Sequence, residues 1–264
     1  MRFDVMTLFP ELFTPFLEQG VTRRAFSGGS VDVHLHQLRD FSSGQYKRID
    51  DRPYGGGAGM VMLAQPLERC VHAIRTQRQA GCEADAAPLV MFTPTGKPLT
   101  HEIVQGYAKS SGAILLCGRY EGVDQRFIDR YVQEEVSLGD FVLSGGEIPA
   151  MALLDAVARL QPGVLGDELS SAQDSFNPSH DGLLDHPHYT RPEVLKWHDS
   201  DEVAKVPEVL LSGNHAKMER WRRNEQLRVT LQKRPELIRK ALQCGVLDKK
   251  DQAFLKDIGY NISL

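Results

Sequence analysis

The sequence predicts an α/β fold built around a parallel sheet, plus a small all-helical C-terminal domain. Short apolar segments of the kind that parallel sheets bury alternate with amphipathic helical stretches up to residue 160. Several segments run directly into glycine-bearing polar loops, as Ala113 to Cys117 does into Gly-Arg-Tyr-Glu-Gly. Near the C-terminus, His215 to Lys240 instead has the charge pattern of an exposed helical face.

The first elements follow from local pattern. Arg2 to Leu8 is predicted as a strand, and Phe9-Pro10-Glu11 begins a helix with proline in its first turn. Val31 to Leu38 alternates apolar and polar residues, which predicts a half-buried strand. His34 and His36 would point outward from it, and we interpret them as solvated histidines rather than a metal pair.

Residues 39 to 62 show no periodicity, and we expect a long loop that ends in Pro53-Tyr54-Gly55-Gly56-Gly57-Ala58-Gly59. A loop of this length is uncommon in a compact domain unless it binds something or is disordered. Its charged, aromatic and glycine residues suit a flap over a polar, planar substrate. The alternative is a flexible surface loop that binds nothing.

The later elements continue the alternation. Apolar spacing predicts strands at residues 89–93, 113–117 and 136–138, and helices at residues 66–80, 99–109, 124–131 and 147–160. Thr100 is a candidate N-cap. A second apolar run, Phe141 to Leu143, leads into Ser144-Gly145-Gly146-Glu147.

The loops that follow the strands at 89–93, 113–117 and 136–138 are the prime site candidate. In a parallel sheet they open on one edge, where such sheets hold ligands. Neither GxxxxGK[ST] nor GxGxxG occurs there, and Glu121, Asp140 and Glu147 oppose the single cation Arg119. A neutral or cationic nucleoside therefore fits better than a pyrophosphate. The alternative is that the glycines only make turns.

Composition indicates a globular protein with one large and one smaller domain. The chain has 264 residues and a formal net charge of −4, which argues against a nucleic-acid coat over its whole surface. Its four cysteines show no CxxC pairing, which favours reduced thiols over zinc or disulfides. We see no signal peptide or membrane span, so a cytoplasmic protein without a membrane partner is expected.

Six collinear motifs are more specific than these patterns: DDRPYGGGAGM, GRYEGVDQR, GDFVLSGGE, DSF, LLDHPHYTRPEV and LLSGNHAKMERWR. Together they closely resemble the bacterial tRNA (guanine-N1)-methyltransferases, which methylate the guanosine 3′ of the anticodon, giving m1G37. The resemblance runs in order from Met1 to about Glu236.

The resemblance implies a fold of the SPOUT type, in which the chain threads through a loop to form a deep trefoil knot. S-adenosyl-L-methionine would lie bent in that knot as the methyl donor. Its implied contacts are Thr93, Pro94, Gly118, Tyr120, Glu121, Gly122, Leu138, Gly139, Phe141, Leu143, Gly145 and Gly146. The chain departs from the family pattern at Thr93-Pro94-Thr95 and at Phe141, which puts only side-chain hydrogen bonds to the donor in doubt.

Methylation of guanine N1 calls for a base near the N1 proton and a cation near O6. Spacing alone leaves several acids open, namely Asp167, Glu168, Asp174, Asp181 and Asp185. The resemblance selects Asp174 as the base and Arg159 as the cation, although the segment after Asp174 is longer than the family pattern. It also implies a homodimer whose active site lies at the subunit interface.

The implied domains are residues 1–163 for donor binding, a linker at 164–189 that carries the base, and a tRNA-binding domain at 190–264. Nine cations against three anions make His215 to Lys240 a basic island, whose alternative is a solvated helix face. The predicted guanosine and tRNA contacts are Gly59, Asp185, His215, Arg220 and Arg223.

No metal ligands are predicted, because neither Cys nor Glu lies at ligand spacing from His186, His188 and His198. Mg2+ recruited with substrate is left open.

Three other functions remain as alternatives. A dinucleotide oxidoreductase would need a glycine-rich turn after the first strand, and Thr7-Leu8-Phe9-Pro10 is not one. A methyltransferase of the same fold acting on ribosomal RNA and a non-catalytic RNA-binding protein are distinguished by RNA methylation and by donor binding.

Overall fold

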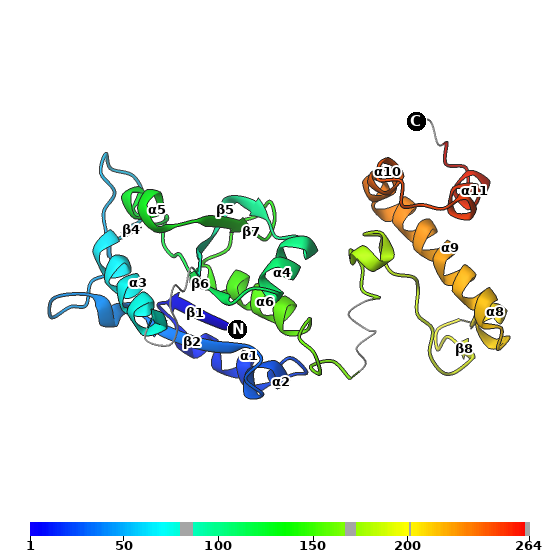
Figure 1. Cartoon of the computed structure of the whole chain (residues 1–264), viewed down its shortest axis with the longest axis horizontal. Helices are drawn as coiled ribbons and strands as arrows, with labels where there is room; N and C mark the ends of the chain where they lie inside the picture. Colours follow the sequence, from blue (N-terminus) through cyan, green and yellow to red (C-terminus); the bar gives the residue numbers. More distant parts are fainter. Residues whose placement is uncertain (80–86, 167–172, 201, 262–264) are drawn as a thin grey trace. The chain divides into compact units, whose positions relative to one another are not determined.

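The protein consists of two compact units, Met1–Asp167 and Glu168–Leu264 (Figure 1). The computed structural model describes residues 1–79, 87–166, 173–200 and 202–261. Within these residues, every helix is too short or too polar to cross a membrane.

The N-terminal unit is built on a five-stranded sheet in the order β2-β1-β6-β5-β7, and every neighbouring pair is parallel. The expectation of an α/β protein with a parallel sheet is therefore confirmed. The strands are β1 (Arg2–Thr7), β2 (Asp32–Gln37), β5 (Leu89–Pro98), β6 (Gly112–Leu116) and β7 (Glu134–Ser137).

Helices cover both faces of this sheet (Figure 1). The core on one face contains β-strand side chains packed with α1 (Thr14–Glu18), α2 (Arg23–Ser27), α4 (His101–Ala108) and α6 (Glu147–Ala158). The core on the other face uses α3 (Ala64–Gln79) and α5 (Gln125–Tyr131). The central strand β6 is buried along its whole length, which explains its continuous apolar sequence. Thr100 caps α4 as predicted, since its hydroxyl accepts from the Ile103 N–H.

Two details of the sheet differ from the prediction. Residues 93–97, expected as a turn, continue β5 across a register shift between Phe92 and Lys97. Gly96 permits this close approach, because a Cβ there would lie 2.5 Å from the Val136 nitrogen. The Phe141 to Leu143 run is an exposed loop and not a buried segment, with Val142 81% exposed.

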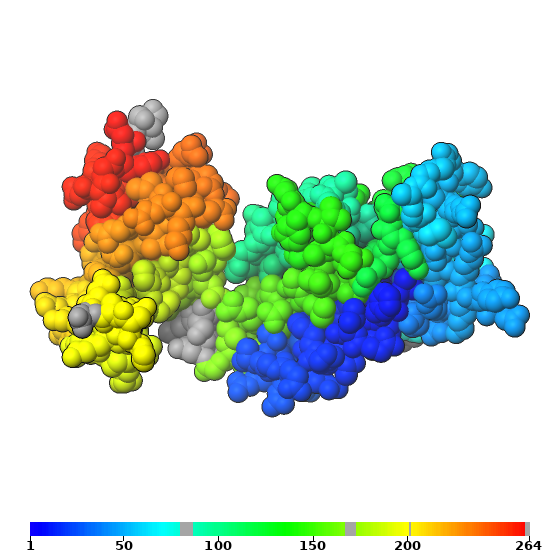
Figure 2. All heavy atoms as spheres, turned by 180° about the vertical axis from the view of Figure 1, so that it is seen from behind, coloured from blue at the N-terminus to red at the C-terminus, as the bar shows by residue number. Residues whose placement is uncertain are grey.

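The predicted long loop at residues 39–62 contains short elements that the absence of periodicity concealed. These are the 3-10 helix η2 (Leu38–Phe41) and the antiparallel pair β3 (Asp50–Asp51) and β4 (Val61–Met62). Residues 52–60, between β3 and β4, project from one end of the unit (Figures 1 and 2). Tyr54, which lies within this segment, is fully exposed.

A buried charge cluster supports the sheet on the α3 side. The Asp4 carboxylate is inaccessible and accepts hydrogen bonds from Arg2 at 2.7 Å, Arg78 at 2.6 Å and His36 at 2.8 Å. The prediction that His36 is a solvated histidine was wrong, because Asp4 on the neighbouring strand draws its ring inward. Burial alone would raise the Asp4 pKa, but these hydrogen bonds lower it well below the ordinary 3.8.

Arg78→Met is expected to destabilise the N-terminal unit by about 3 kcal/mol, because it removes one partner of a buried ion pair. Denaturant unfolding followed by circular dichroism measures this, with Arg75→Met on the same helix as control. Since the Asp4 pKa is depressed, the stabilisation is complete above about pH 4 and is lost as the pH falls toward the lowered pKa. Equal losses in both variants would contradict the role assigned to Arg78.

The C-terminal unit packs α9 (His215–Lys233), α10 (Pro235–Gln243) and α11 (Lys249–Asp257) around a small core, with α8 (Glu208–Leu211) beside α9. The expectation that this domain is all-helical was wrong. Two short β-prone runs, β8 (Val194–Lys196) and β9 (Val203–Lys205), pair in an antiparallel manner. Leu183, from the predicted linker, is fully buried in the helical core.

Candidate functional site

One cavity of about 440 Å³ lies at the carboxyl ends of β6 and β7 and at the register shift within β5, a size suited to one small molecule. Eleven of the twelve residues predicted as donor contacts line it, and Gly139 is the exception. Gly139 lies next to the lining, where its N–H and its carbonyl each lie 3.1 Å from the Ser137 hydroxyl. Residues from three separate strands and the segments that follow two of them thus meet at one place, as the parallel sheet predicts.

The glycines of these loops have different structural roles. A Cβ on Gly118 would meet only Val123, at 3.7 Å, so the space above Gly118 is open. A Cβ on Gly146 would lie 2.6 Å from the Cys117 Cα, so Gly146 allows two chain segments to pass closely. A Cβ on Gly145 would strike the Arg119 side chain. Only Gly118 therefore combines ordinary backbone geometry with open space toward the cavity.

Arg119, which lines the cavity, forms an ion pair with Glu147. The sequence analysis missed this pair. Glu147, at the start of α6, is 1% exposed and accepts a hydrogen bond from the Thr7 hydroxyl at 2.8 Å. Arg119 Nη2 lies 2.9 Å from Glu147 Oε2, and Arg119 Nη1 donates to the Ser144 carbonyl at 3.1 Å. The sequence did contain a signal for this ion pair, namely the opposite charges of Arg119 and Glu147 in adjacent loops. The pair joins the loop after β6 to the start of α6.

The segment that ends at β4 is attached to the loop after β6. The Glu121 N–H donates to the Met60 carbonyl and the Met62 N–H to the Gly122 carbonyl, both at 2.9 Å. A Cβ on Gly59 would collide with the Glu121 side chain. The predicted substrate residue Gly59 therefore lies directly beside a cavity loop.

Tyr120, in the loop after β6, also interacts with this part of the chain, through Asp50 of β3 and Arg39 of η2. Burial raises its pKa, and nearby Asp50 raises it further while Arg39 opposes the shift. Its backbone has a positive φ of 60°, which is uncommon outside glycine and marks a constrained loop.

The two predicted catalytic residues lie in different units. Arg159 is the half-buried C-cap residue of α6, and its N–H donates to the Asp155 carbonyl at 3.0 Å. Asp174 is half-buried in the C-terminal unit, where its carbonyl accepts from the Asn177 N–H at 3.2 Å. The predicted contact Asp185 also belongs to this unit.

The predicted tRNA residues of α9 fall into two groups. His215 is exposed at the start of the helix, where the Asn214 side chain accepts from the Lys217 N–H at 3.1 Å. Arg220 and Arg223 instead bind the buried Asp251 of α11, at 2.8 and 2.7 Å. Both arginines therefore tie α9 to α11, a role that spacing along one helix does not reveal.

A parallel sheet with a glycine-lined cavity at its carboxyl edge is the arrangement in which α/β proteins hold small organic ligands. Residues 1–240 match the model of the family described as tRNA (Guanine-1)-methyltransferase TrmD. The chain is 62% identical over 255 residues to the tRNA (guanine-N(1)-)-methyltransferase of Paracidovorax citrulli, covering 97% of each protein. It is 60% identical over 261 residues to that of a Polaromonas species, covering 99% of this chain and 98% of the relative.

The chain belongs to the tRNA (guanine-1)-methyltransferase family and is a methyltransferase. The resemblance inferred from the six motifs is therefore confirmed. The oxidoreductase, ribosomal RNA and non-catalytic alternatives agree with neither the family nor the names of these relatives.

Proposed function

We propose that the chain transfers a methyl group from S-adenosyl-L-methionine to N1 of the guanosine 3′ of the anticodon in tRNA. The observation that carries the proposal is the convergence of eleven predicted donor contacts on one cavity. The open space over Gly118 fits a ligand that approaches the backbone closely. Residues 1–163 then bind the donor, residues 164–189 supply the base, and residues 190–264 bind tRNA.

The donor supplies an activated methyl group on a positively charged sulfur. In this proposal the irregular part of β5 and the loops after β6 and β7 hold it largely through backbone groups. The Arg119–Glu147 pair keeps two of these loops in register, because it joins the loop after β6 to the start of α6, where the loop after β7 ends. Since these contacts involve the backbone, the departures at Thr93, Thr95 and Phe141 leave them in place.

The acceptor chemistry is assigned to Asp174 and Arg159. Asp174 takes the N1 proton, which frees the lone pair for attack, and Arg159 stabilises the negative charge that develops on O6. In the proposed homodimer, Asp174 of one subunit works with the donor cavity of the other. Any Mg2+ required is proposed to arrive with the tRNA.

Exposed apolar side chains on the N-terminal unit support the proposed homodimer. Phe9, Leu12, Phe141, Val142 and Ile148 are each at least 42% exposed. Phe141 and Val142 belong to the cavity lining, so a second subunit that covers them would help to close the site. The proposed trefoil knot agrees with the tight passage of Gly146 against Cys117, two segments distant in sequence.

A methylation assay tests the proposal. Purified chain, radiolabelled donor and an unmodified tRNA transcript should give labelled guanosine at position 37, and the same transcript with adenosine there should give none. Equal labelling of both transcripts would contradict the proposed position. Failure of the donor to bind in a calorimetric titration would contradict the donor assignment.

Lys217→Ala with Arg222→Ala should weaken tRNA binding and lower the slope of log affinity against log salt by up to about two. Both side chains are exposed on α9, and the described part of the chain shows no ion pair for either. Arg220→Ala with Arg223→Ala should also lower the melting temperature of the C-terminal unit, because Asp251 loses its partners. An unchanged salt slope in the first double variant would make this surface a solvated face.

A further inference from the structure

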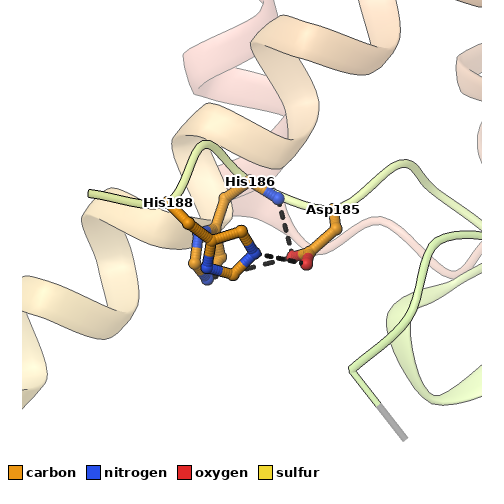
Figure 3. Close-up of side chains that lie close together, drawn as sticks. All are labelled: Asp185, His186 and His188. Atoms are coloured by element: carbon orange, nitrogen blue, oxygen red, sulfur yellow. Dashed lines mark hydrogen bonds and ion pairs between the residues drawn. The ribbon is translucent and has the colours of Figure 1, made fainter. Parts of the chain in front are cut away.

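A carboxylate and two imidazole rings converge in the C-terminal unit (Figure 3). Asp185 Oδ2 lies 2.8 Å from His188 Nε2, and Asp185 Oδ1 lies 3.9 Å from His186 Nε2. The ring centroids of His186 and His188 are 4.5 Å apart. One potential ligand atom from each residue lies within 4.8 Å of the other two, so a single ion can reach all three.

The hydrogen bonding of His186 prepares its other nitrogen for a cation. His186 Nδ1 lies 3.1 Å from the Pro187 carbonyl oxygen, which accepts only, so Nδ1 carries the proton. In the neutral ring Nε2 is then a lone pair that faces the Asp185 carboxylate. A cation between the His186 Nε2 lone pair and the Asp185 carboxylate stabilises both groups, because each donates an electron pair. Metal-binding histidines are commonly oriented by such a backbone bond.

Asp185 and His186 are held in place by their neighbours, whereas His188 is free to move. The Asp185 N–H donates to the Ser175 hydroxyl at 2.9 Å, and the His186 side chain is only 12% exposed, with its ring 6.5 Å from that of Trp221. His188 is 71% exposed. Ligand atoms of a tetrahedral zinc site lie about 3.3 Å apart, so His188 must withdraw by roughly 0.5 Å from Asp185. The Nε2 proton that His188 donates to Asp185 leaves to water when the ion binds. An exposed ring makes that movement easily.

We propose that Asp185, His186 and His188 bind a divalent transition-metal ion of the zinc type, with a fourth position open to water. Two imidazoles with one carboxylate suit Zn2+, Co2+ or Ni2+, whereas Mg2+ prefers oxygen ligands alone. The sequence analysis predicts no metal site because it considers only Cys and Glu beside the histidines. The missing ligand is Asp185, the residue before His186.

The bound ion occupies Asp185, which is also a proposed tRNA contact, so ion and tRNA compete. This second statement rests on the proposed function, whereas metal binding itself does not. Excess Zn2+ should therefore lower tRNA affinity without changing donor affinity.

Titration of the untagged, chelator-treated chain with Co2+, followed by its visible absorption, tests the site. One Co2+ per chain is expected, displaced by equimolar Zn2+ but not by about a hundredfold excess of Mg2+. His188→Ala and Asp185→Asn should each weaken Co2+ binding at least about tenfold. His198→Ala, which removes an exposed histidine of the same unit, is the matched control and should leave binding unchanged.

Absence of a saturable Co2+ signal in the parent chain overturns the site. So does a His188→Ala variant that keeps the parent's near-ultraviolet circular dichroism and binds Co2+ as well as the parent. Addition of tRNA to the Co2+-loaded chain should reduce the absorption. An unchanged spectrum with tRNA bound overturns the competition and leaves the metal site standing.

Discussion

Asp174→Asn is expected to slow methyl transfer by at least about a hundredfold while donor affinity stays at the parent value. The amide keeps the size of the side chain but no longer accepts the N1 proton. The residue lies in the C-terminal unit and outside the cavity lining, so no donor contact is lost. Single-turnover methylation and calorimetric donor titration measure the two quantities separately. Higher pH should restore part of the rate, because hydroxide then helps to remove the proton.

Asp199→Asn is the matched control, because it makes the same change at an exposed position of the same unit. It should methylate at the parent rate. Parent-like activity in Asp174→Asn would remove Asp174 from the mechanism. The assignment of the base would then return to the other acids in the segment, among them Asp181 and Asp185.

Mixed dimers test whether the base acts across subunits. One chain carries Asp174→Asn and the other carries a blocked donor cavity, Gly118→Leu. If each site combines the cavity of one chain with the carboxylate of the other, one of the two sites in the heterodimer carries neither change. Activity should then appear that neither parent dimer shows. A mixture proven to contain heterodimers but inactive would rule out the shared site.

Gly118→Leu is expected to reduce donor affinity at least about a hundredfold, or roughly 2.7 kcal/mol. The new side chain enters open space in the cavity, because an added Cβ meets only Val123 at ordinary contact distance. The fold should survive, since Gly118 does not need the left-handed backbone conformation. Isothermal titration with S-adenosyl-L-methionine measures the loss, and the melting temperature reports on folding.

Gly106→Leu is the control for this substitution. Gly106 is exposed on α4 with nothing within 4 Å of an added Cβ, so donor affinity and stability should match or exceed the parent values. Parent-like donor affinity in folded Gly118→Leu would show that the donor binds elsewhere. Gly145 is a poorer test than Gly118, because bulk there displaces Arg119 and so disturbs the Glu147 ion pair.

The sequence by itself determined the alternation of buried strands and amphipathic helices, and with it the edge of the sheet where the cavity lies. Burial is encoded locally: the apolar run at 113–117 predicts an interior strand without any knowledge of its neighbours. Capping is local as well, as Thr100 and Asn214 show. The family motifs were sufficient to identify the enzyme class.

Only the tertiary structure decided which charged groups meet. Asp4 pairs with Arg78 across 74 positions, Arg119 with Glu147 at the start of α6, and Arg223 with Asp251 between two helices. A single strand or helix specifies which way a side chain points but not which side chain it meets. The partner depends on how distant segments pack, and that packing reflects the free energy of the whole core and not any local pattern.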